Sequence, residues 1–205
     1  MEPFTKLTAI AAPLDMANVD TDKIIPGRFL RKLRGPGYDK LAFHDIRFNT
    51  DGSENPDFVL NKPRYKGAQI LIAGENFGCG SSREGAVLAL LAEGFRCVVA
   101  PSFGDIFRDN AWQNGLLTIV ADEETIARIA AAVEAANDPE MAVDLVRNVI
   151  VPPIGDPIPF EIDAERRQAL LAGMDELDVL LARLPELDTF VAADRPARPW
   201  AWPAL

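Results

Sequence analysis

The chain has 205 residues, of which 48% are hydrophobic and 25% charged, and its formal net charge is −10 at pH 7. A chain of this length and composition buries one substantial core, which excludes a disordered or fibrous protein and leaves room for a second small lobe. The negative charge repels phosphate backbones and anionic headgroups, so we expect neither nucleic acid nor a membrane among its partners. A small dicarboxylate would have to be held by particular arginines.

The longest apolar stretches, residues 86–92 and 97–100, are much shorter than the ~20 residues of a membrane span. No basic stretch leads into a hydrophobic one near the N-terminus, so we predict a cytoplasmic protein without a secretory signal. The two cysteines, Cys79 and Cys97, lack the close spacing of a zinc or redox site. A cubane iron–sulfur cluster with an open iron takes three thiolates, so we expect no metal or cofactor to be bound by this chain alone.

The first third of the chain is poor in regular patterns. Residues 4–10 alternate apolar and polar side chains and predict a strand that ends near Pro13. Residues 18–26 predict an irregular turn, in which Asx and Thr side chains bond backbone amides. A short helical stretch is expected at residues 28–33, followed by a loop-like region at 35–64 that could carry a lid.

Strands and helices then alternate, which predicts an α/β fold with parallel βαβ units and right-handed crossovers. The expected strands are residues 69–73, 97–100 and 117–120. The expected helices are residues 84–93, ended by Gly94, and a second one capped by Ser102 that runs to about residue 112.

The C-terminal part predicts a helix at residues 122–136, capped by Asp122, and then two strands at 142–151 and 158–162. A final helix pair, residues 163–172 and 175–184, is broken at Gly173. We divide the chain into a domain at residues 1–190 and an extended tail, rich in proline and tryptophan, at residues 191–205.

One segment between a predicted strand and a predicted helix carries the chemistry, and it reads Gly74-Glu75-Asn76-Phe77-Gly78-Cys79-Gly80-Ser81-Ser82-Arg83-Glu84. Its glycines allow close approach of a ligand, and the helix N-terminus offers free amides to an anion. Arg83 adds a planar fork suited to a carboxylate. The alternatives are a purely structural turn with Ser82 as a cap, or a nucleotide cradle, whose P-loop and Gly-x-Gly-x-x-Gly spacings are absent.

Several strings together resemble the small subunits of isopropylmalate dehydratase, which belong to the aconitase superfamily. They are Asn18-Val19-Asp20-Thr21-Asp22, Ile24-Ile25-Pro26, the Asn76 to Glu84 string, Ala100-Pro101-Ser102-Phe103-Gly104-Asp105-Ile106-Phe107, Asn114-Gly115-Leu116-Leu117 and Leu170-Leu171-Ala172-Gly173-Met174-Asp175-Glu176-Leu177. The resemblance extends over about residues 4–190, with the strings in the family's order.

The resemblance implies a swivelling β/β/α domain like the last domain of aconitase, which closes over a 4Fe-4S cluster held by a separate large subunit. The implied enzyme is a hydro-lyase that isomerises 2-isopropylmalate and 3-isopropylmalate in leucine biosynthesis. Ser81 would then remove the carbon-bound proton, and Gly80, Ser82 and Arg83 would hold a substrate carboxylate. A serine in this role needs activation by amides and positive charge.

The same resemblance places Asp20, Thr21 and Asp22 beside the site, and gives the segment Phe29, Leu30 and Arg31 a part in recognising the substrate's distal group. Both sets have a structural alternative, as turn-forming or core residues. Gly85 departs from the family, which usually has histidine there. A related hydroxy diacid of the methylated malate or homocitrate type, or a carboxylate-binding module without catalysis, therefore stays open as an alternative.

Trp200 and Trp202 lie outside the predicted core, and such exposed rings often contact another chain. We expect the tail or residues 35–64 to meet the large subunit.

Overall fold

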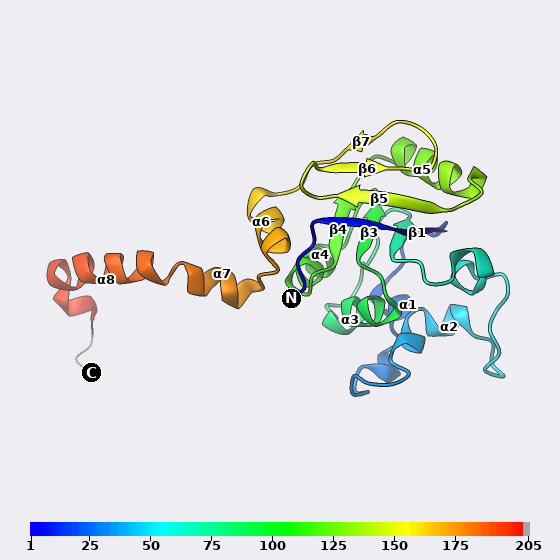
Figure 1. Ribbon diagram of the computed structural model, residues 1–205. Helices are drawn as coiled ribbons and strands as arrows, with labels where there is room; N and C mark the ends of the chain where they lie inside the picture. Colours follow the sequence, from blue (N-terminus) through cyan, green and yellow to red (C-terminus); the bar gives the residue numbers. More distant parts are fainter. Residues whose placement is uncertain (203–205) are drawn as a thin grey trace.

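The computed structural model describes residues 1–202 and contains a seven-stranded mixed sheet surrounded by helices (Figure 1). The strands are β1 (Lys6–Leu14), β2 (Ile70–Ala73), β3 (Cys97–Ala100), β4 (Leu117–Val120), β5 (Glu140–Asp144), β6 (Val149–Val151) and β7 (Ile158–Pro159). The helices are α1 (Thr21–Ile24), α2 (His44–Arg47), α3 (Glu84–Glu93), α4 (Asp105–Gln113), α5 (Glu123–Ala135), α6 (Ala164–Ala172), α7 (Glu176–Ala182) and α8 (Leu184–Ala197). Among the described residues, no helix is long and apolar enough to span a membrane.

The parallel half of the sheet follows the predicted alternation. Strands β4, β3, β2 and β1 are neighbours in that order, and all three pairings are parallel. Strands β2 and β3 are entirely buried, which explains their continuous apolar sequences. The α/β fold with parallel βαβ units is therefore confirmed, and the carboxyl ends of β1, β2 and β3 meet at one edge.

The antiparallel half departs from the prediction. Residues 142–151 form a hairpin of β5 and β6 rather than one strand, with Asp144 paired to Val149. Asn148 takes a left-handed φ of 53°, which asparagine tolerates, and the Asp144 carboxylate accepts the Arg147 N–H at 2.9 Å. The strand expected at residues 158–162 is shorter, because only Ile158 and Pro159 pair with β6.

Two helix starts were predicted from capping residues, with different results. Asp122 caps α5 as expected, since its carboxylate accepts the Thr125 N–H at 2.7 Å. The predicted cap at Ser102 is wrong, because α4 begins after Gly104. The Ser102 hydroxyl instead accepts the Asn76 N–H at 2.8 Å and so belongs to the neighbouring turn. The helical stretch expected at residues 28–33 is a single 3-10 turn, Gly27–Phe29.

The C-terminal helices continue further than predicted. Helix α6 ends at Gly173 as expected, but α8 runs to Ala197 and a 3-10 turn covers Pro199–Ala201, so an extended conformation is wrong for this part of the tail. The proline in the first turn of α8 lacks an N–H, but no helical hydrogen bond is lost because the first N–H groups of a helix have no partner within it. After the helix, the Trp202 indole N–H donates to the Asp194 carboxylate at 2.9 Å. Residues 203–205 of the predicted tail lie outside the described residues. The boundary at residue 190 falls within α8 and stays a prediction.

Helices α7 and α8 stand away from the sheet and form an arm (Figure 1). At its base, α6 is tied to the N-terminus, because the amino group of Met1 donates to the Gly173 carbonyl at 2.9 Å and the Phe4 N–H donates to the Leu170 carbonyl at 2.9 Å. The arm is therefore attached to the core through α6 rather than through a loose linker.

Candidate active site

The glycine-rich turn after β2 lies directly beside the loop after β1. The Asn18 N–H donates to the Glu75 carbonyl at 2.9 Å, the Gly78 N–H to Val19 at 2.7 Å, and the Thr21 N–H to Cys79 at 2.9 Å. These bonds extend the pairing of β1 and β2 past the ends of the strands. The structure thus brings together the two motifs that the sequence resemblance placed at one site.

Glycine is required where this turn packs against the start of α4. Gly78 has a φ of +72°, and a Cβ atom there would lie 2.2 Å from Cγ of Phe107. On the other side, a Cβ atom at Gly104 would lie 2.5 Å from the Gly78 carbonyl oxygen. The Phe107 ring and the two backbone segments occupy the space that side chains would need, so only glycine fits at these two positions.

Ser81 lies at the exposed end of this turn. Its backbone carbonyl accepts the Thr21 hydroxyl at 2.9 Å, and Gly80 before it has a φ of +89°. Asp20 caps α1 by accepting the Lys23 N–H at 2.7 Å. Thr21 therefore ties the loop to the turn and Asp20 fixes the loop itself, while Ser81 and Ser82 are exposed.

Arg83 is held at the N-terminus of α3 by an ion pair with Asp22. The Asp22 carboxylate also accepts the Gly27 N–H at 3.2 Å. The hydrogen bond from Arg83 lowers the pKa of Asp22 and raises the pKa of Arg83. The Arg83 side chain is only 17% exposed, and its ion pair with Asp22 keeps the guanidinium charged and fixes its direction. No side chain caps α3, so no side chain occupies the positive end of this helix beside Arg83.

The three residues of the segment expected to recognise the substrate's distal group have different surroundings in the structure. Phe29 packs against the core, with its ring 4.8 Å from that of His44. Leu30 is 43% exposed, and a Cβ atom on Gly85 would lie 3.1 Å from its Cδ2. Arg31 is exposed and makes no ion pair among the described residues. Leu30 therefore lies close to the first turn of α3, and the part of this segment in recognising the distal group stays a prediction.

Gly27 is part of the site, but the sequence analysis did not single it out. A Cβ atom on Gly27 would lie 3.4 Å from the Asp22 carboxylate and 3.9 Å from Nη1 of Arg83. The Pro26-Gly27 dipeptide is a common turn signal, and it is the sequence feature that could have predicted a bend of the backbone here.

The part of the chain that the structure describes offers no ligand set for an iron–sulfur cluster. Within residues 1–202, no three His, Cys, Asp or Glu side chains are grouped so that they could hold a metal ion. Both cysteines are free thiols, and burial raises the pKa of Cys97 well above its usual range, which disfavours a thiolate ligand.

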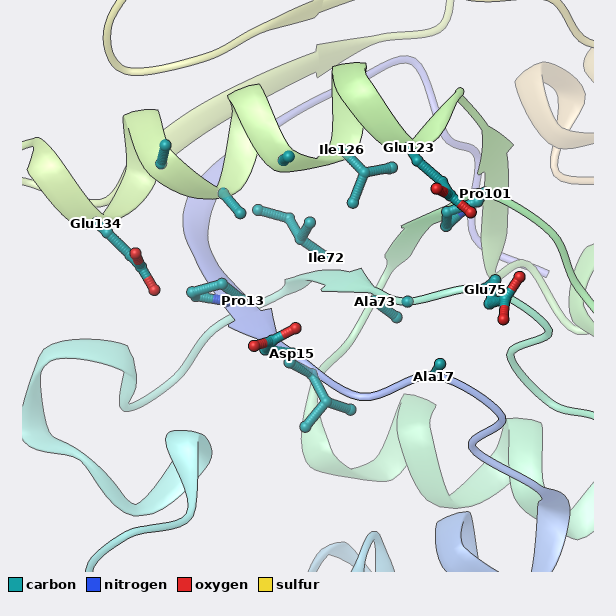
Figure 2. A pocket seen from close by; sticks show the side chains of 15 residues that line it. Pro13, Asp15, Ala17, Ile72, Ala73, Glu75, Pro101, Glu123, Ile126 and Glu134 are labelled. Carbon is teal, nitrogen blue, oxygen red and sulfur yellow. The ribbon is translucent and has the colours of Figure 1, made fainter.

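A separate cavity of about 480 Å³ opens between α5 and the carboxyl ends of β1 and β2 (Figure 2). Ile72 and Ile126 form part of its apolar lining. The charged residues that line it are all acidic, namely Asp15, Glu75, Glu123 and Glu134. Because four carboxylates and no basic side chain line it, this cavity repels a dicarboxylate.

Comparison with known proteins identifies the family. Residues 1–124 match the model of the aconitase C-terminal domain. The chain is 47% identical over 200 residues to a 3-isopropylmalate dehydratase small subunit from Dinoroseobacter shibae, in an alignment that covers 98% of this chain and 100% of that protein. The chain belongs to the family of 3-isopropylmalate dehydratase small subunits. The resemblance drawn from the sequence strings is thereby confirmed.

Other members of the small-subunit family agree with this assignment. The small subunit from Afipia carboxidovorans is also 47% identical, with 98% of this chain and 100% of that protein covered. The fold resembles the crystal structure of 3-isopropylmalate dehydratase from Methanocaldococcus jannaschii, with a TM-score of 0.64, 28% identity, and 90% of this chain and 98% of that chain covered.

Proposed function

We propose that this chain is the small subunit of a heteromeric hydro-lyase that interconverts 2-isopropylmalate and 3-isopropylmalate by dehydration and rehydration in leucine biosynthesis. Small subunits of this name match the chain at 47% identity over nearly all of its length. The observation that carries the proposal is the site itself: an exposed serine, Ser81, two residues before a fixed guanidinium at the N-terminus of α3.

In this proposal the chain supplies the base and part of the carboxylate site. Arg83, with the Ser82 hydroxyl and the Gly80 backbone, binds one substrate carboxylate, and Oγ of Ser81 accepts the carbon-bound proton. An ordinary serine is too weak a base for this step. The free amides of α3 and the charge of Arg83 stabilise the alkoxide that the role requires. Loss of the hydroxyl then gives the alkene, and water adds back at the neighbouring carbon.

The rest of the site would come from a large subunit. The hydroxyl needs a Lewis acid to leave, and no group of side chains in the described part of this chain could hold a metal ion in that role. We therefore propose that a 4Fe-4S cluster in the large subunit fills that role, and that the small domain swivels to close over it. We also propose a cytoplasmic location, which the two free thiols favour.

The test is anaerobic turnover of 3-isopropylmalate by this chain together with the cluster-bearing large subunit of the same genome. Turnover should require both chains, and Ser81→Ala should lower kcat by about 100-fold or more because the proton acceptor is lost. The control is Thr8→Ala, which removes an exposed hydroxyl from the antiparallel half of the sheet and should leave kcat unchanged.

The remaining outcomes separate the alternatives. Turnover of only a methylated malate or a homocitrate relative would keep the mechanism and change the substrate. Full activity of Ser81→Ala would exclude Ser81 as the base. A stable complex that binds a dicarboxylate but turns over none would support a binding module instead.

A further inference from the structure

The cavity between α5 and the carboxyl ends of β1 and β2 has no part in the proposed reaction, and we call it the acidic cavity (Figure 2). Its volume of about 480 Å³ lies within the range of ligand pockets, roughly 300–1,000 Å³. The face of α5 that lines it has a glutamate at each end, Glu123 and Glu134. Between them stand small or apolar residues at helical spacing, namely Ile126, Ala127, Ala130 and Ala131. The alanines leave a hollow opposite Ile72, so the interior of the cavity is apolar.

The charges around this apolar interior have one sign. The carboxylates come from α5 and from the segments that follow β1 and β2, so they stand around the hollow (Figure 2): Asp15, Glu75, Glu123 and Glu134. Within residues 1–202, none of the four forms an ion pair with a basic side chain. Other carboxylates of the chain, such as Glu93 and Asp109, do pair with arginines. The acidic cavity is therefore complementary to a cation and repels an anion.

A lysine or arginine side chain has the two parts that this cavity accommodates. Its alkyl stem packs on apolar surface while its charged head stays beside polar groups at the rim. A free alkylamine would gain little, because all four carboxylates are exposed and water screens them. The same side chain binds more strongly when it belongs to a protein that already covers the neighbouring surface, because its local concentration is then high.

That neighbouring surface is the turn that carries Ser81. Glu75 lines the cavity, and its backbone carbonyl accepts the Asn18 N–H at 2.9 Å within the candidate site. The backbone segments around Gly74 are in close contact, since a Cβ atom there would lie 2.5 Å from the Met16 carbonyl oxygen. The wall of the cavity and the glycine-rich turn are thus held together as one surface. A large subunit that closes over Ser81 also reaches the cavity.

We propose that the acidic cavity is a docking site for the large subunit and receives a lysine or arginine side chain from it when the two chains assemble. This inference rests on the proposed function, in which the large subunit covers the site. The cavity contributes to assembly and takes no part in proton transfer. Its residues therefore change the affinity between the chains and leave the turnover of the assembled enzyme unchanged.

The first test removes two of the charges, in the double variant Asp15→Asn with Glu134→Gln. The dissociation constant for the large subunit, measured by calorimetry at low salt, should rise about tenfold. Added salt should weaken binding of the variant less than binding of the wild type. The kcat at saturating large subunit should not change.

The control for the charge variant is Glu124→Gln with Glu140→Gln. Both carboxylates are exposed and neither lines the cavity, so this variant changes the net charge equally. Its dissociation constant should equal that of the wild type.

The second test fills the cavity without changing any charge. Ala131→Phe places a ring in the hollow and should also raise the dissociation constant about tenfold, because the ring clashes with the docked side chain. Ala131 is exposed on α5, so the helix keeps its packing against the sheet. Ala135→Phe, at an exposed alanine of the same helix outside the cavity, is the matched control and should bind normally.

Unchanged dissociation constants in the charge variant or in Ala131→Phe would overturn the inference and leave the proposed function intact. An equal loss in Glu124→Gln with Glu140→Gln would assign the effect to net charge and overturn it as well. Binding of n-butylamine to the wild-type chain alone, with assembly unaffected by either variant, would give the cavity to a small amine instead. Failure of the wild-type chain to bind the large subunit at all would overturn both the inference and the proposed function.

Discussion

Asp22 is the residue that fixes the direction of Arg83. Its carboxylate is 58% exposed, so water screens the ion pair and its contribution to stability is small. In the proposed function a substrate carboxylate takes the place of Asp22 at the guanidinium, and the exposure of Asp22 means that this exchange leaves no buried charge unpaired. The pair therefore keeps Arg83 in place in the absence of ligand.

The stability provided by this pair should depend on pH. The hydrogen bond from Arg83 holds the pKa of Asp22 below its ordinary value of 3.8. A lowered carboxylate pKa stabilises the fold above the unfolded value, and this contribution is lost as the pH falls through the folded value. We expect Asp22→Asn to be less stable than wild type at about pH 6 and equally stable near about pH 2, measured by urea unfolding.

The control for this experiment is Asp188→Asn, an exposed carboxylate on α8. The free energy of unfolding of this variant should differ little from that of wild type across the same pH range. A difference for Asp22→Asn that persists unchanged at the acid end would contradict the assignment to the ion pair.

At the scale of elements, the glycine-rich turn is stabilised by its contact with α4. Gly78→Ala should destabilise the protein by about 3 kcal/mol, because it combines a left-handed backbone with a side chain pressed into a buried ring. Gly37→Ala is matched, since Gly37 has a φ of +81° but no atom within 4 Å of its Cβ position. This control should cost only about 1 kcal/mol. Equal losses in denaturant unfolding would show that the Phe107 contact is not responsible.

The elements that were predicted correctly are those with strong local signals. The parallel strands β2, β3 and β4 and the helix that ends at Gly94 follow from short apolar runs separated by turn residues. The hairpin of β5 and β6 was missed because its turn, residues 145–148, contains one asparagine and no glycine or proline. The Ser102 cap failed because the hydroxyl bonds a neighbouring turn instead of its own helix.

At the scale of the molecule, the arm of α7 and α8 exposes apolar side chains at helical spacing. They are Leu177, Leu180, Leu181, Leu184, Leu187 and Phe190, each at least 45% exposed. The base of the arm is held in place, because the Gln113 amide donates to Glu176 and Arg183 pairs with Glu165, each at 3.0 Å. Contact with a second copy is disfavoured by the net charge of −10. We therefore expect the large subunit to cover this arm.

The arm can be tested with the double substitution Leu181→Glu and Leu184→Glu. It should weaken binding to the large subunit by about tenfold or more, because charged side chains would have to be buried in the interface. The circular dichroism spectrum should not change, since both residues are exposed. Ile154→Glu, at an exposed apolar position between β6 and β7, is the control and should bind normally. Unchanged affinity of the double variant, measured by calorimetry, would contradict a role for the arm.

The sequence by itself determined the α/β class and the turn that carries Ser81 and Arg83, because apolar periodicity and glycine-rich turns act over short distances along the chain. It also indicated the family, through the resemblance of several strings of residues. Only the tertiary structure decided that Asp22 pairs with Arg83 across 61 residues, that Leu30 covers Gly85, and that α7 and α8 leave the core. These contacts depend on which strands become neighbours in the sheet, and no local pattern of residues specifies that.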